Sequence, residues 1–591
     1  MKVLVIGSGG REHALVWKLS QSEKVRSICC APGNAGIKKL ANCVRIAADD
    51  IDGLLEFALK ENFDLTVVGP ENALAAGIVD RFAEKGLRIF GPNAAAAELE
   101  SSKVFCKEFL KKHNIPSAEY QAFDKPGAAK KYIDEIGSPC VVKANGLAAG
   151  KGVVVCESVE EAKDTVDQMM KEGAFGEAGH SVVVEQFLTG EEASFIAFVD
   201  GETVLPLPSS QDHKAVFEGD RGPNTGGMGA YSPAPVMDDG MCMRVMNEVM
   251  LPTVRGMAEE GRPFKGMLYA GMMIDGDEIN VLEFNCRFGD PECQPLLMRL
   301  QTDLVEILEK VIDGRLSEIE LEIDPRAAVC VVMASEGYPG AYVTGKAISG
   351  LMNAGKLKDV MIFHAGTTIE NRRTVTSGGR VLGVTALDST INKAIERAYK
   401  AVDKIRWKGS YFRRDIGHRA ISHMQKNTGP LVGVVMGSDS DLPVMKTATD
   451  FLNTMGIKNE VKIASAHRTP ELAAEYARMA AHRGLKVIIA GAGMAAHLAG
   501  VLAAHTTLPV IGVPIDASSL NGLDALLSTV QMPPGIPVGT MGIGKAGAKN
   551  AAVFAARILA AHNPDLTAAL EQYSREMAEQ VEAKNQALAQ G

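Results

Sequence analysis

The chain starts the same kind of structural pattern twice, at residue 1 and again at residue 431. Residues 1–100 alternate short apolar runs, such as KVLVIG and DLTVVGP, with amphipathic segments, which is typical of β-α-β units and a parallel sheet. The polar stretch 418–430 ends in Gly-Pro and reads as a linker, after which LVGVVMGSDSD begins a new strand, turn and helix. A chain of 591 residues is also too long for one hydrophobic core. We therefore expect a multidomain α/β and α+β protein with two separate parts.

The tail of the chain carries an apolar helical face. Residues 563–588 place Leu566, Leu570, Tyr573 and Met577 on that face, which favours packing on the same domain or on a partner over cofactor binding. The predicted boundaries are 1–102 for a Rossmann-like domain, 103–325 for a mixed domain with a Gly-rich centre, 326–425 for a smaller α+β domain, 426–430 for a linker, and 431–591 for a parallel-sheet domain with a C-terminal helix.

Composition argues against several classes of protein. The net charge of -10 gives no sign of a nucleic-acid surface. The 10 cysteines include no CxxC pair and all precede residue 331, so neither a zinc site nor a disulfide framework is expected. The chain enters a strand at MKVLVIG, from which we expect no signal peptide and a reducing, cytoplasmic environment.

One stretch is long and apolar enough to raise the question of a membrane span. Residues 487–515 contain no Asp, Glu, Lys or Arg. They do contain two histidines, two prolines and four glycines, and they divide into VIIAG, a small-residue segment and LPVIGVP. A buried strand-helix-strand of a parallel sheet fits this pattern better than a membrane span.

The N-terminal glycines predict an anion site. In VIGSGGREHA the glycines follow a strand and open a helix, so that backbone N–H groups can approach a phosphate. A dinucleotide fold would place a third glycine near Glu12 and an acid after the second strand, and both are missing, which disfavours a nicotinamide dehydrogenase. Arg11, and Glu71 after a later strand, instead suit a phosphate-and-sugar ligand. Tight turns without a ligand remain the alternative.

Two further stretches suggest nucleotide chemistry. PCVVKANGLAAGKGVVV, 139–155, places Lys143 on a strand before a Gly/Ala-rich loop, although it is not a Walker loop. NVLEFNCRFGDPE, 280–292, places Glu283 and Asn285 on one face of a strand. Two oxygen ligands on one face suit Mg²⁺ held together with phosphate oxygens. Either stretch alone is commonly no more than a strand.

Together with GSGGREHAL, APGNAGI and GPNTGGMGAYSP, these stretches resemble the ATP-grasp superfamily and, within it, the glycinamide ribonucleotide synthetase family, over about residues 1–425. The resemblance implies a small lid at about 121–188, and ATP, Mg²⁺ (or Mn²⁺), glycine and 5-phosphoribosylamine as ligands. It implies Glu283 and Asn285 as metal ligands, with Arg287 and Asp290 as catalytic residues that anchor glycine. It implies ATP-binding roles for Lys103, Lys143, Gly146, Gly150, Lys151, Gly152, Glu185, Phe187 and Glu192. It implies phosphoribosylamine-binding roles for Gly9, Gly10, Arg11, Glu71, Asp212, His213, Lys214 and Asn224.

The second part of the chain gathers polar residues at three strand ends. These are MGSDSD, ASAHRTPEL and AGAGMAAHLAG. In the second, Thr469 can cap a helix that Pro470 begins, which places His467 and Arg468 on a strand-to-helix turn. A histidine titrates near neutral pH and can move a proton without a cofactor. A flavodoxin-like domain with a structural histidine remains the alternative.

With QMPPGIPVGT and GIGKAGAKNAA, these motifs resemble the 5-(carboxyamino)imidazole ribonucleotide mutase family over about 431–565. The resemblance implies a flavodoxin-like three-layer domain, no cofactor, an imidazole ribonucleotide substrate and a homo-octamer. It implies His467 as the proton carrier. It implies substrate contacts from Ser438, Ser440, Asp441, Ser465, Arg468, Gly491 and His497. Ala499 and Met494 depart from the family's pattern, which leaves open a carboxylase that uses free CO₂. The remaining alternative is that one of the two parts of the chain is not catalytic and serves only for oligomerisation.

Overall fold

The computed structural model describes residues 1–147, 152–172, 179–426, 430–481, 483–561 and 563–590. The chain divides into two compact units, unit 1 (residues 1–421) and unit 2 (residues 422–591). Among the described residues, no helix is both long and apolar enough to cross a bilayer.

Unit 1 begins with a parallel sheet in the order β3-β2-β1-β4-β5, the strand order of a Rossmann-like fold. β1 is apolar from Val3 to Ile6 because both of its faces are buried there: Val3 and Val5 enter one core, and Leu4 and Ile6 enter another. The strands are β1 (Lys2–Gly7), β2 (Ser27–Pro32), β3 (Asn42–Cys43), β4 (Leu65–Val68) and β5 (Ile89–Phe90). The helices are α1 (Gly10–Leu19), α2 (Ile51–Glu61), α3 (Glu71–Ala75), α4 (Ile78–Ala83) and α5 (Ala94–Ser101).

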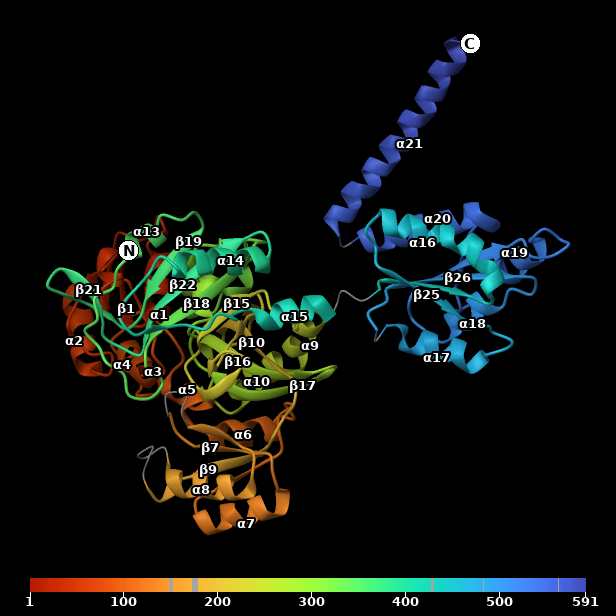
Figure 1. Cartoon of the computed structure of the whole chain (residues 1–591). Helices are drawn as coiled ribbons and strands as arrows, with labels where there is room; N and C mark the ends of the chain where they lie inside the picture. Colours follow the sequence, from red (N-terminus) through yellow and green to blue (C-terminus); the bar gives the residue numbers. More distant parts are fainter. Residues whose placement is uncertain (148–151, 173–178, 427–429, 482, 562, 591) are drawn as a thin grey trace. The chain divides into compact units, whose positions relative to one another are not determined.

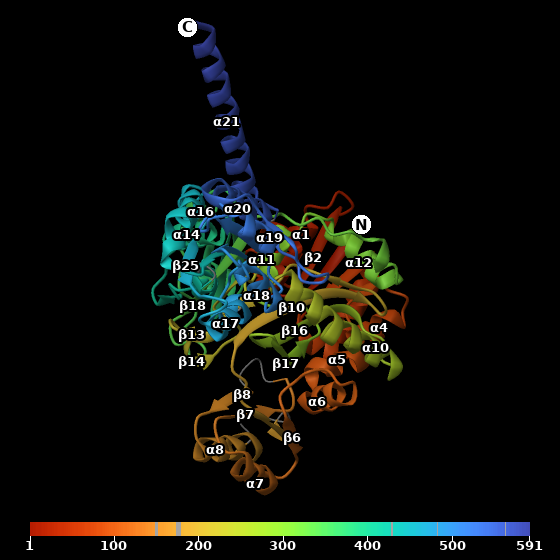
Figure 2. The ribbon, with the colours of Figure 1, turned by 90° about the vertical axis from the view of Figure 1, so that its right-hand side faces the viewer.

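Two antiparallel sheets follow. One has its own small core and the order β6-β9-β7-β8, and its helices α7 and α8 lie on the side away from α5 and α6 (Figures 1 and 2). The other has the order β11-β10-β16-β17. The first sheet and its helices are β6 (Tyr120–Phe123), α7 (Pro126–Ile136), β7 (Cys140–Ala144), β8 (Val153–Cys156), α8 (Val159–Met170) and β9 (Val182–Gln186). The second sheet and its helices are α6 (Lys103–Lys112), β10 (Glu191–Asp200), β11 (Val204–Pro206), α9 (Asp239–Val245), α10 (Leu251–Glu259), β16 (Lys265–Asp275), β17 (Glu278–Asn285), α11 (Cys293–Arg299) and α12 (Leu304–Asp313).

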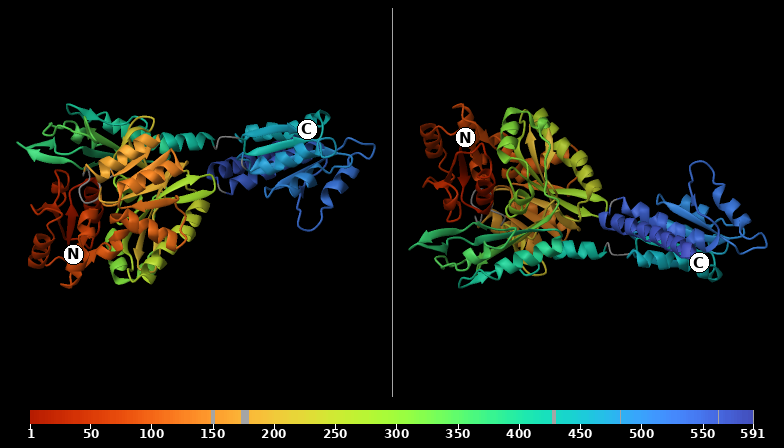
Figure 3. Two further views of the ribbon diagram at one scale, coloured as in Figure 1. Left: turned by 90° about the horizontal axis from the view of Figure 1, so that it is seen from below. Right: turned by 90° about the horizontal axis from the view of Figure 1, so that it is seen from above.

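The last sheet of unit 1 crosses the predicted boundary at residue 326. Its order is β12-β15-β18-β22-β19, and its first two strands come from residues 211–232. Both views in Figure 3 place the N-terminal layer (red) beside the strands that follow residue 326 (green), where α1 packs on β19. The elements are β12 (Gln211–Asp212), β13 (Ala215–Phe217), β14 (Arg221–Asn224), β15 (Gly229–Ser232), β18 (Ala327–Ser335), α13 (Leu351–Ala354), β19 (Val360–His364), β20 (Thr367–Glu370), β21 (Arg373–Thr376), β22 (Arg380–Asp388), α14 (Ile391–Val402) and β23 (Ser410–Tyr411).

The prediction of a linker over residues 418–430 is wrong for its first nine residues. They form α15 (His418–Lys426), and residues 427–429 lie outside the described part of the chain. The first turn of α15 is tied to unit 1, because Arg419 Nε donates to Asp220 Oδ2 at 2.9 Å and His418 Nε2 lies 3.3 Å from the same oxygen. The polar composition of this stretch favoured a linker, whereas ion pairs to Asp220 stabilise a helix there.

Arg413 is the largest fully buried polar side chain of unit 1 and joins the same cluster. Its guanidinium donates to Asp415 Oδ1 and Oδ2 at 2.8 Å and to Asp220 Oδ1 at 2.9 Å. We expect Arg413→Met to lower the free energy of unfolding of unit 1 by about 3–5 kcal/mol, because two carboxylates lose their buried cation. The exposed neighbour variant Arg414→Met should change it by less than about 0.5 kcal/mol.

Both tryptophans, Trp17 and Trp407, lie in unit 1, so tryptophan fluorescence during urea unfolding reports on this unit alone. Equal unfolding midpoints for the Arg413 and Arg414 variants would contradict the role given to the Arg413 cluster.

Unit 2 is a three-layer domain around a parallel sheet in the order β25-β24-β26-β27-β28, the flavodoxin-like order. α16 and α20 pack on one face, and α17 and α18 pack on the other (Figure 1). Residues 487–515 form the strand-helix-strand β26-α18-β27, as predicted. The elements are β24 (Val432–Met436), α16 (Leu442–Thr454), β25 (Asn459–Ile463), α17 (Pro470–Ala480), β26 (Val487–Gly493), α18 (Leu498–Ala504), β27 (Val510–Ile515), α19 (Leu523–Val530), β28 (Gly539–Thr540), α20 (Gly544–Ala560) and α21 (Pro564–Gln590).

Candidate active sites

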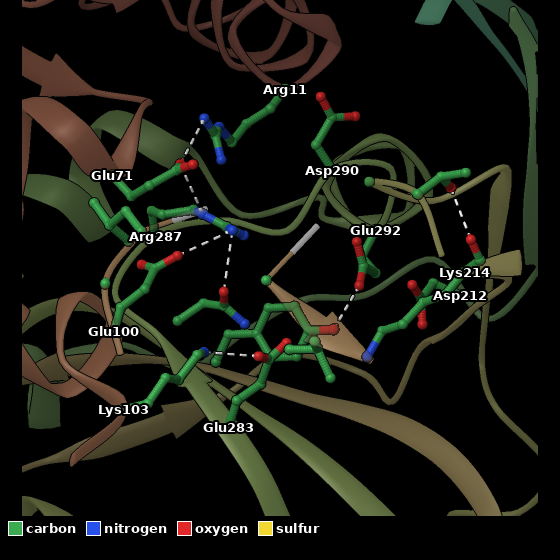
Figure 4. Close-up of a pocket in the computed structure, with 18 of the residues that line it drawn as sticks. Arg11, Glu71, Glu100, Lys103, Asp212, Lys214, Glu283, Arg287, Asp290 and Glu292 are labelled. Carbon is green, nitrogen blue, oxygen red and sulfur yellow. Dashed lines mark hydrogen bonds and ion pairs between the residues drawn. The ribbon is translucent and has the colours of Figure 1, made fainter. Parts of the chain in front are cut away.

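A polar pocket in unit 1 joins the N-terminal sheet, the β10–β17 sheet and the last sheet (Figure 4). It brings together eleven of the residues predicted for the ligase: Arg11, Glu71, Lys103, Gly146, Gly152, Asp212, Lys214, Glu283, Asn285, Arg287 and Asp290. Residues from both ends of a 280-residue stretch thus line one site, which only the fold could bring together.

Arg287 lies at the centre of one wall. Its Nε donates to Glu71 Oε2 at 3.2 Å, and its Nη2 donates to Asn285 Oδ1 at 3.0 Å and lies 3.0 Å from Glu100 Oε1 (Figure 4). Burial alone would raise the pKa of Glu71, but the guanidiniums of Arg287 and Arg11 lower it to about 2. Glu71 is therefore ionised at neutral pH and can accept hydrogen bonds from hydroxyl groups.

Glu283 and Asn285 lie on one face of β17, as predicted, and both reach the pocket. Lys103 Nζ donates to Glu283 Oε2 at 2.9 Å and is the main reason why the pKa of Glu283 lies far below its usual value. An ionised carboxylate and an amide oxygen two residues apart are a donor set that fits Mg²⁺. Lys103, predicted to contact phosphates, is held beside this pair.

The residues predicted for ATP divide into three groups. Gly146 and Gly152 line the pocket, whereas Gly150 and Lys151 lie outside the described residues. The others are not in the described wall of the pocket: Lys143 pairs with the buried Glu185 at 2.9 Å, Glu192 pairs with Lys214 at 2.8 Å, and Phe187 is half-buried beside Glu185.

Two predicted substrate residues lie away from the pocket. Asp212 and Lys214 line it, but His213 between them is fully buried on the other side of the chain, where its Nε2 accepts a hydrogen bond from Gly417 N at 3.0 Å. Burial lowers the pKa of His213 to about 4. Asn224 is exposed on β14. In this structure neither side chain reaches the substrate pocket, since side chains along an extended segment alternate in direction.

Gly9 and Gly10 serve close packing. A Cβ on Gly10 would lie 2.6 Å from Gln294 Nε2, and one on Gly9 would lie 2.7 Å from Glu12 Oε2. The Gly9 N–H already donates to Glu12 Oε2 at 2.5 Å. The N-terminus of α1 therefore meets a carboxylate of its own helix at the position predicted for a phosphate.

His213, Asp220 and His418 form the only group of three or more potential metal ligands among the residues that the structure describes. The Asp220 carboxylate already pairs with the guanidiniums of Arg413 and Arg419 at 2.9 Å each. A divalent cation would lie against two fixed positive charges there, so this cluster is a structural one.

Burial of Asp212 is expected to make the free energy of unfolding of unit 1 depend on pH. Burial raises the pKa of Asp212 to about 7, partly opposed by the Lys214 ammonium, so the folded protein binds a proton that the unfolded chain loses near pH 4. The stability of unit 1 should therefore fall as the pH rises from about 4 to about 7 and level off above it. We expect Asp212→Asn to be more stable than the wild type by roughly 1–3 kcal/mol at pH 8, with a smaller difference at pH 5.

The comparison needs only urea unfolding of the two proteins at pH 5 and pH 8, followed by tryptophan fluorescence. A stability difference that is the same at both pH values would show that ionisation of Asp212 carries no folding cost.

Among the pocket residues that were not predicted, four have charged or aromatic side chains: Glu100, Tyr269, Glu292 and Arg380. Tyr269 Oη donates to Glu292 Oε1 at 2.7 Å, and Arg380 Nη1 donates to Asp290 O at 2.5 Å. Glu292 ends the motif FNCRFGDPE and could have been found there. The others come from α5, β16 and β22, and no local pattern marks them.

The pocket of unit 2 forms where β24, β25 and β26 end, at the point where the strand order reverses. Seven of the predicted residues line it: Ser438, Ser440, Asp441, Ser465, His467, Arg468 and His497. Gly491 does not, because it is buried within β26, where a Cβ would lie 2.4 Å from Met445 Sδ. This glycine makes room for α16 rather than for a ligand.

His467 and His497 are hydrogen-bonded to each other, Nε2 to Nδ1, at 2.8 Å. Arg468 Nη2 donates to Gly437 O at 2.6 Å and so joins the turns after β24 and β25. Thr469 does precede α17, but its hydroxyl accepts from Ser465 N at 3.0 Å and does not cap the helix. The turn therefore places two exposed histidine rings in direct hydrogen-bond contact at the pocket.

Met494 follows β26 with a φ of 53°, in the left-handed region that favours glycine. Its side chain is 58% exposed at the rim of the pocket. The departure from a glycine at this position therefore keeps the turn and adds an apolar side chain beside the site.

Both units match models of known protein families. Residues 1–100, 101–293 and 328–419 match the family models for the N domain, the ATP-grasp (A) domain and the C domain of phosphoribosylglycinamide synthetase, and residues 431–580 match the family model AIR carboxylase. A phosphoribosylamine–glycine ligase of Allochromatium vinosum is 55% identical over 425 residues, which cover 71% of this chain and 99% of that protein. The ligase of Escherichia coli O157:H7 is 54% identical, over 72% and 100%.

Solved structures give the same result for unit 1. The phosphoribosylamine–glycine ligase of Thermotoga maritima has a TM-score of 0.62 at 32% identity and covers 70% of this chain and 100% of its own. A biotin carboxylase domain of Hydrogenobacter thermophilus, at 17% identity and a TM-score of 0.54, shares the fold. The chain belongs to the phosphoribosylamine–glycine ligase family, and it carries behind the ligase domains a further domain of the AIR carboxylase family.

Proposed function

We propose that unit 1 joins glycine to 5-phosphoribosylamine at the expense of ATP, giving glycinamide ribonucleotide, ADP and phosphate. The observation that carries this is the single pocket in which Lys103, Glu283, Asn285 and Arg287 lie beside Arg11 and Glu71. It offers cations for carboxylate and phosphate groups and an ionised acceptor for sugar hydroxyls.

The chemistry requires alignment and charge neutralisation more than a protein nucleophile. A glycine carboxylate oxygen attacks the γ-phosphorus of ATP, the bond to the ADP oxygen breaks, and an acyl phosphate forms. The phosphoribosylamine nitrogen then attacks the acyl carbon, phosphate leaves, and the nitrogen loses a proton as the amide forms. Arg287 orients the glycine carboxylate, and Asp290 holds its ammonium group. Glu283 and Asn285 would hold Mg²⁺, which neutralises charge on the phosphates when bound.

We propose that unit 2 converts 5-(carboxyamino)imidazole ribonucleotide into its 4-carboxy isomer without a cofactor. The carboxylate leaves the exocyclic nitrogen and forms a carbon–carbon bond at C4, and the proton of C4 goes to the nitrogen. His467, with His497 at 2.8 Å, is placed to carry that proton. Ser438, Ser440, Ser465 and Arg468 are proposed to hold the ribose phosphate.

The alternative for unit 2 is a carboxylase that joins free CO₂ to aminoimidazole ribonucleotide. The two reactions separate in one assay, in which the carboxyamino substrate is supplied in buffer free of bicarbonate. Formation of the 4-carboxy product supports the mutase. Product only from aminoimidazole ribonucleotide with bicarbonate would assign the carboxylase instead.

We further propose that the protein assembles through unit 2 as a homo-octamer and works in the cytoplasm, as an enzyme of purine biosynthesis. The α21 residues Leu566, Leu570 and Tyr573 pack on their own domain, whereas Met577 and Val581 further along are 43% and 58% exposed. Val461 and Ile463 on the edge strand β25 are also exposed. Exposed apolar groups at two places favour association between copies. A monomer by light scattering would overturn the octamer.

A further inference from the structure

Glu185 is a buried carboxylate, and two lysines form ion pairs with the same one of its two oxygens. It lies on β9 and is 2% exposed, with its Oε2 2.9 Å from Lys143 Nζ and 3.1 Å from Lys107 Nζ. The other oxygen, Oε1, is buried and has no hydrogen-bond partner among the described residues. Buried acceptors are normally paired, so a lone one marks a place that a ligand completes.

The two lysines differ in their surroundings. Lys143 Nζ also donates to Leu282 O at 3.1 Å, next to the proposed metal ligand Glu283, and its strand leads into the 146–152 loop. Lys107, on α6, is 2% exposed, and Glu185 is its only ion-pair partner in the part of the chain that the structure describes. Burying an ammonium group has a large desolvation cost unless an anion pairs with it. Lys107 is therefore buried as the ion-pair partner of Glu185.

We propose that Lys107 is a positioning residue that fixes the orientation of the Glu185 carboxylate, so that its free Oε1 accepts a hydrogen bond from the amino group of adenine and rejects a 6-oxo purine. This inference rests on the proposed function, in which Lys143 contacts the ATP phosphates and Glu185 the base. Once Lys143 turns to the phosphates, Lys107 is the cation that remains beside Glu185.

The selectivity follows from the position of the Glu185 carboxylate. A carboxylate oxygen facing a 6-oxo group sets two acceptors against each other, and neither is satisfied. Without the Lys107 ammonium at 3.1 Å from Oε2, the carboxylate is no longer fixed from this side and can turn, so that Oε1 no longer faces the 6-position of the base. Loss of Lys107 should therefore relax the choice of base rather than only weaken binding.

The test measures kcat/KM of ligation with ATP and with ITP. For Lys107→Met we expect the ATP/ITP ratio to fall at least tenfold, and for Lys107→Arg, which keeps the charge, to stay within about threefold of the wild type. Lys111→Met is the matched control, since Lys111 is exposed on the same helix, and its ratio should not change. Loss of folded enzyme lowers both rates equally and leaves the ratio unaltered.

Lys107→Gln, which keeps a polar group beside Glu185, replaces Lys107→Met if the latter does not fold, and the same fall is expected. A ratio that stays within twofold of the wild type in these uncharged variants would overturn the inference. A wild-type protein without ATP-dependent ligation would instead overturn the proposed function, so the two failures are distinct.

Discussion

Replacing His467 by asparagine is expected to slow carboxylate transfer by about 10²–10⁴-fold while ligation of glycine keeps its wild-type rate. Asparagine fits the exposed turn before α17 but cannot take up and release a proton near neutral pH. The hydrogen bond between His467 Nε2 and His497 Nδ1 at 2.8 Å fixes the ring of His467 beside a residue predicted to contact the substrate. The rate of formation of the 4-carboxy product measures the effect.

His505→Asn is the matched control for this substitution. His505 is exposed after α18 and is not among the residues that line the pocket of unit 2. Both activities should survive in that variant. Near-normal carboxylate transfer by the His467 variant would remove His467 from the reaction.

Glu283→Gln is expected to reduce kcat/KM for ligation by at least about 10²–10³-fold, with carboxylate transfer unchanged. The substitution removes the negative charge that pairs with Lys103 at 2.9 Å and replaces a charged proposed metal ligand by a neutral one. Mg²⁺ would then be held more weakly beside the ATP phosphates, whose charge it neutralises when bound. Steady-state rates at several Mg²⁺ concentrations measure both effects.

Glu278→Gln provides the control from the same strand, because Glu278 is exposed at the start of β17. It should ligate at the wild-type rate at every Mg²⁺ concentration. If the Glu283 variant also did so, Glu283 would hold neither the metal nor the charge balance of the pocket.

The unit 2 site was more predictable from sequence than the unit 1 site. In a parallel sheet the carboxyl ends of neighbouring strands meet at one edge, so three polar strand ends predict one pocket. His467, Arg468 and His497 were found in this way. Gly491 was also predicted, but it does not line the pocket and lies within the buried part of β26, where a Cβ would be 2.4 Å from Met445 Sδ.

In unit 1 the sequence brought residues to the same pocket where one motif carries several of them, as with Glu283, Asn285 and Arg287. The prediction missed Tyr269 and Arg380, which reach the pocket from separate sheets and have no motif of their own. His213 could have been separated from Asp212 and Lys214 by strand alternation alone. The linker prediction failed for a different reason, because ion pairs between distant residues, such as Arg419 and Asp220, stabilise α15.

We expect the two activities of this chain to come from independent sites. Ligation and carboxylate transfer should be measured side by side on single preparations of the wild type, Glu283→Gln and His467→Asn. The wild type should have both activities, and each variant should lose one and keep the other within about twofold. A similar fall of both rates in either variant, or a wild type without one of the activities, would show that the chain does not carry two independent enzymes.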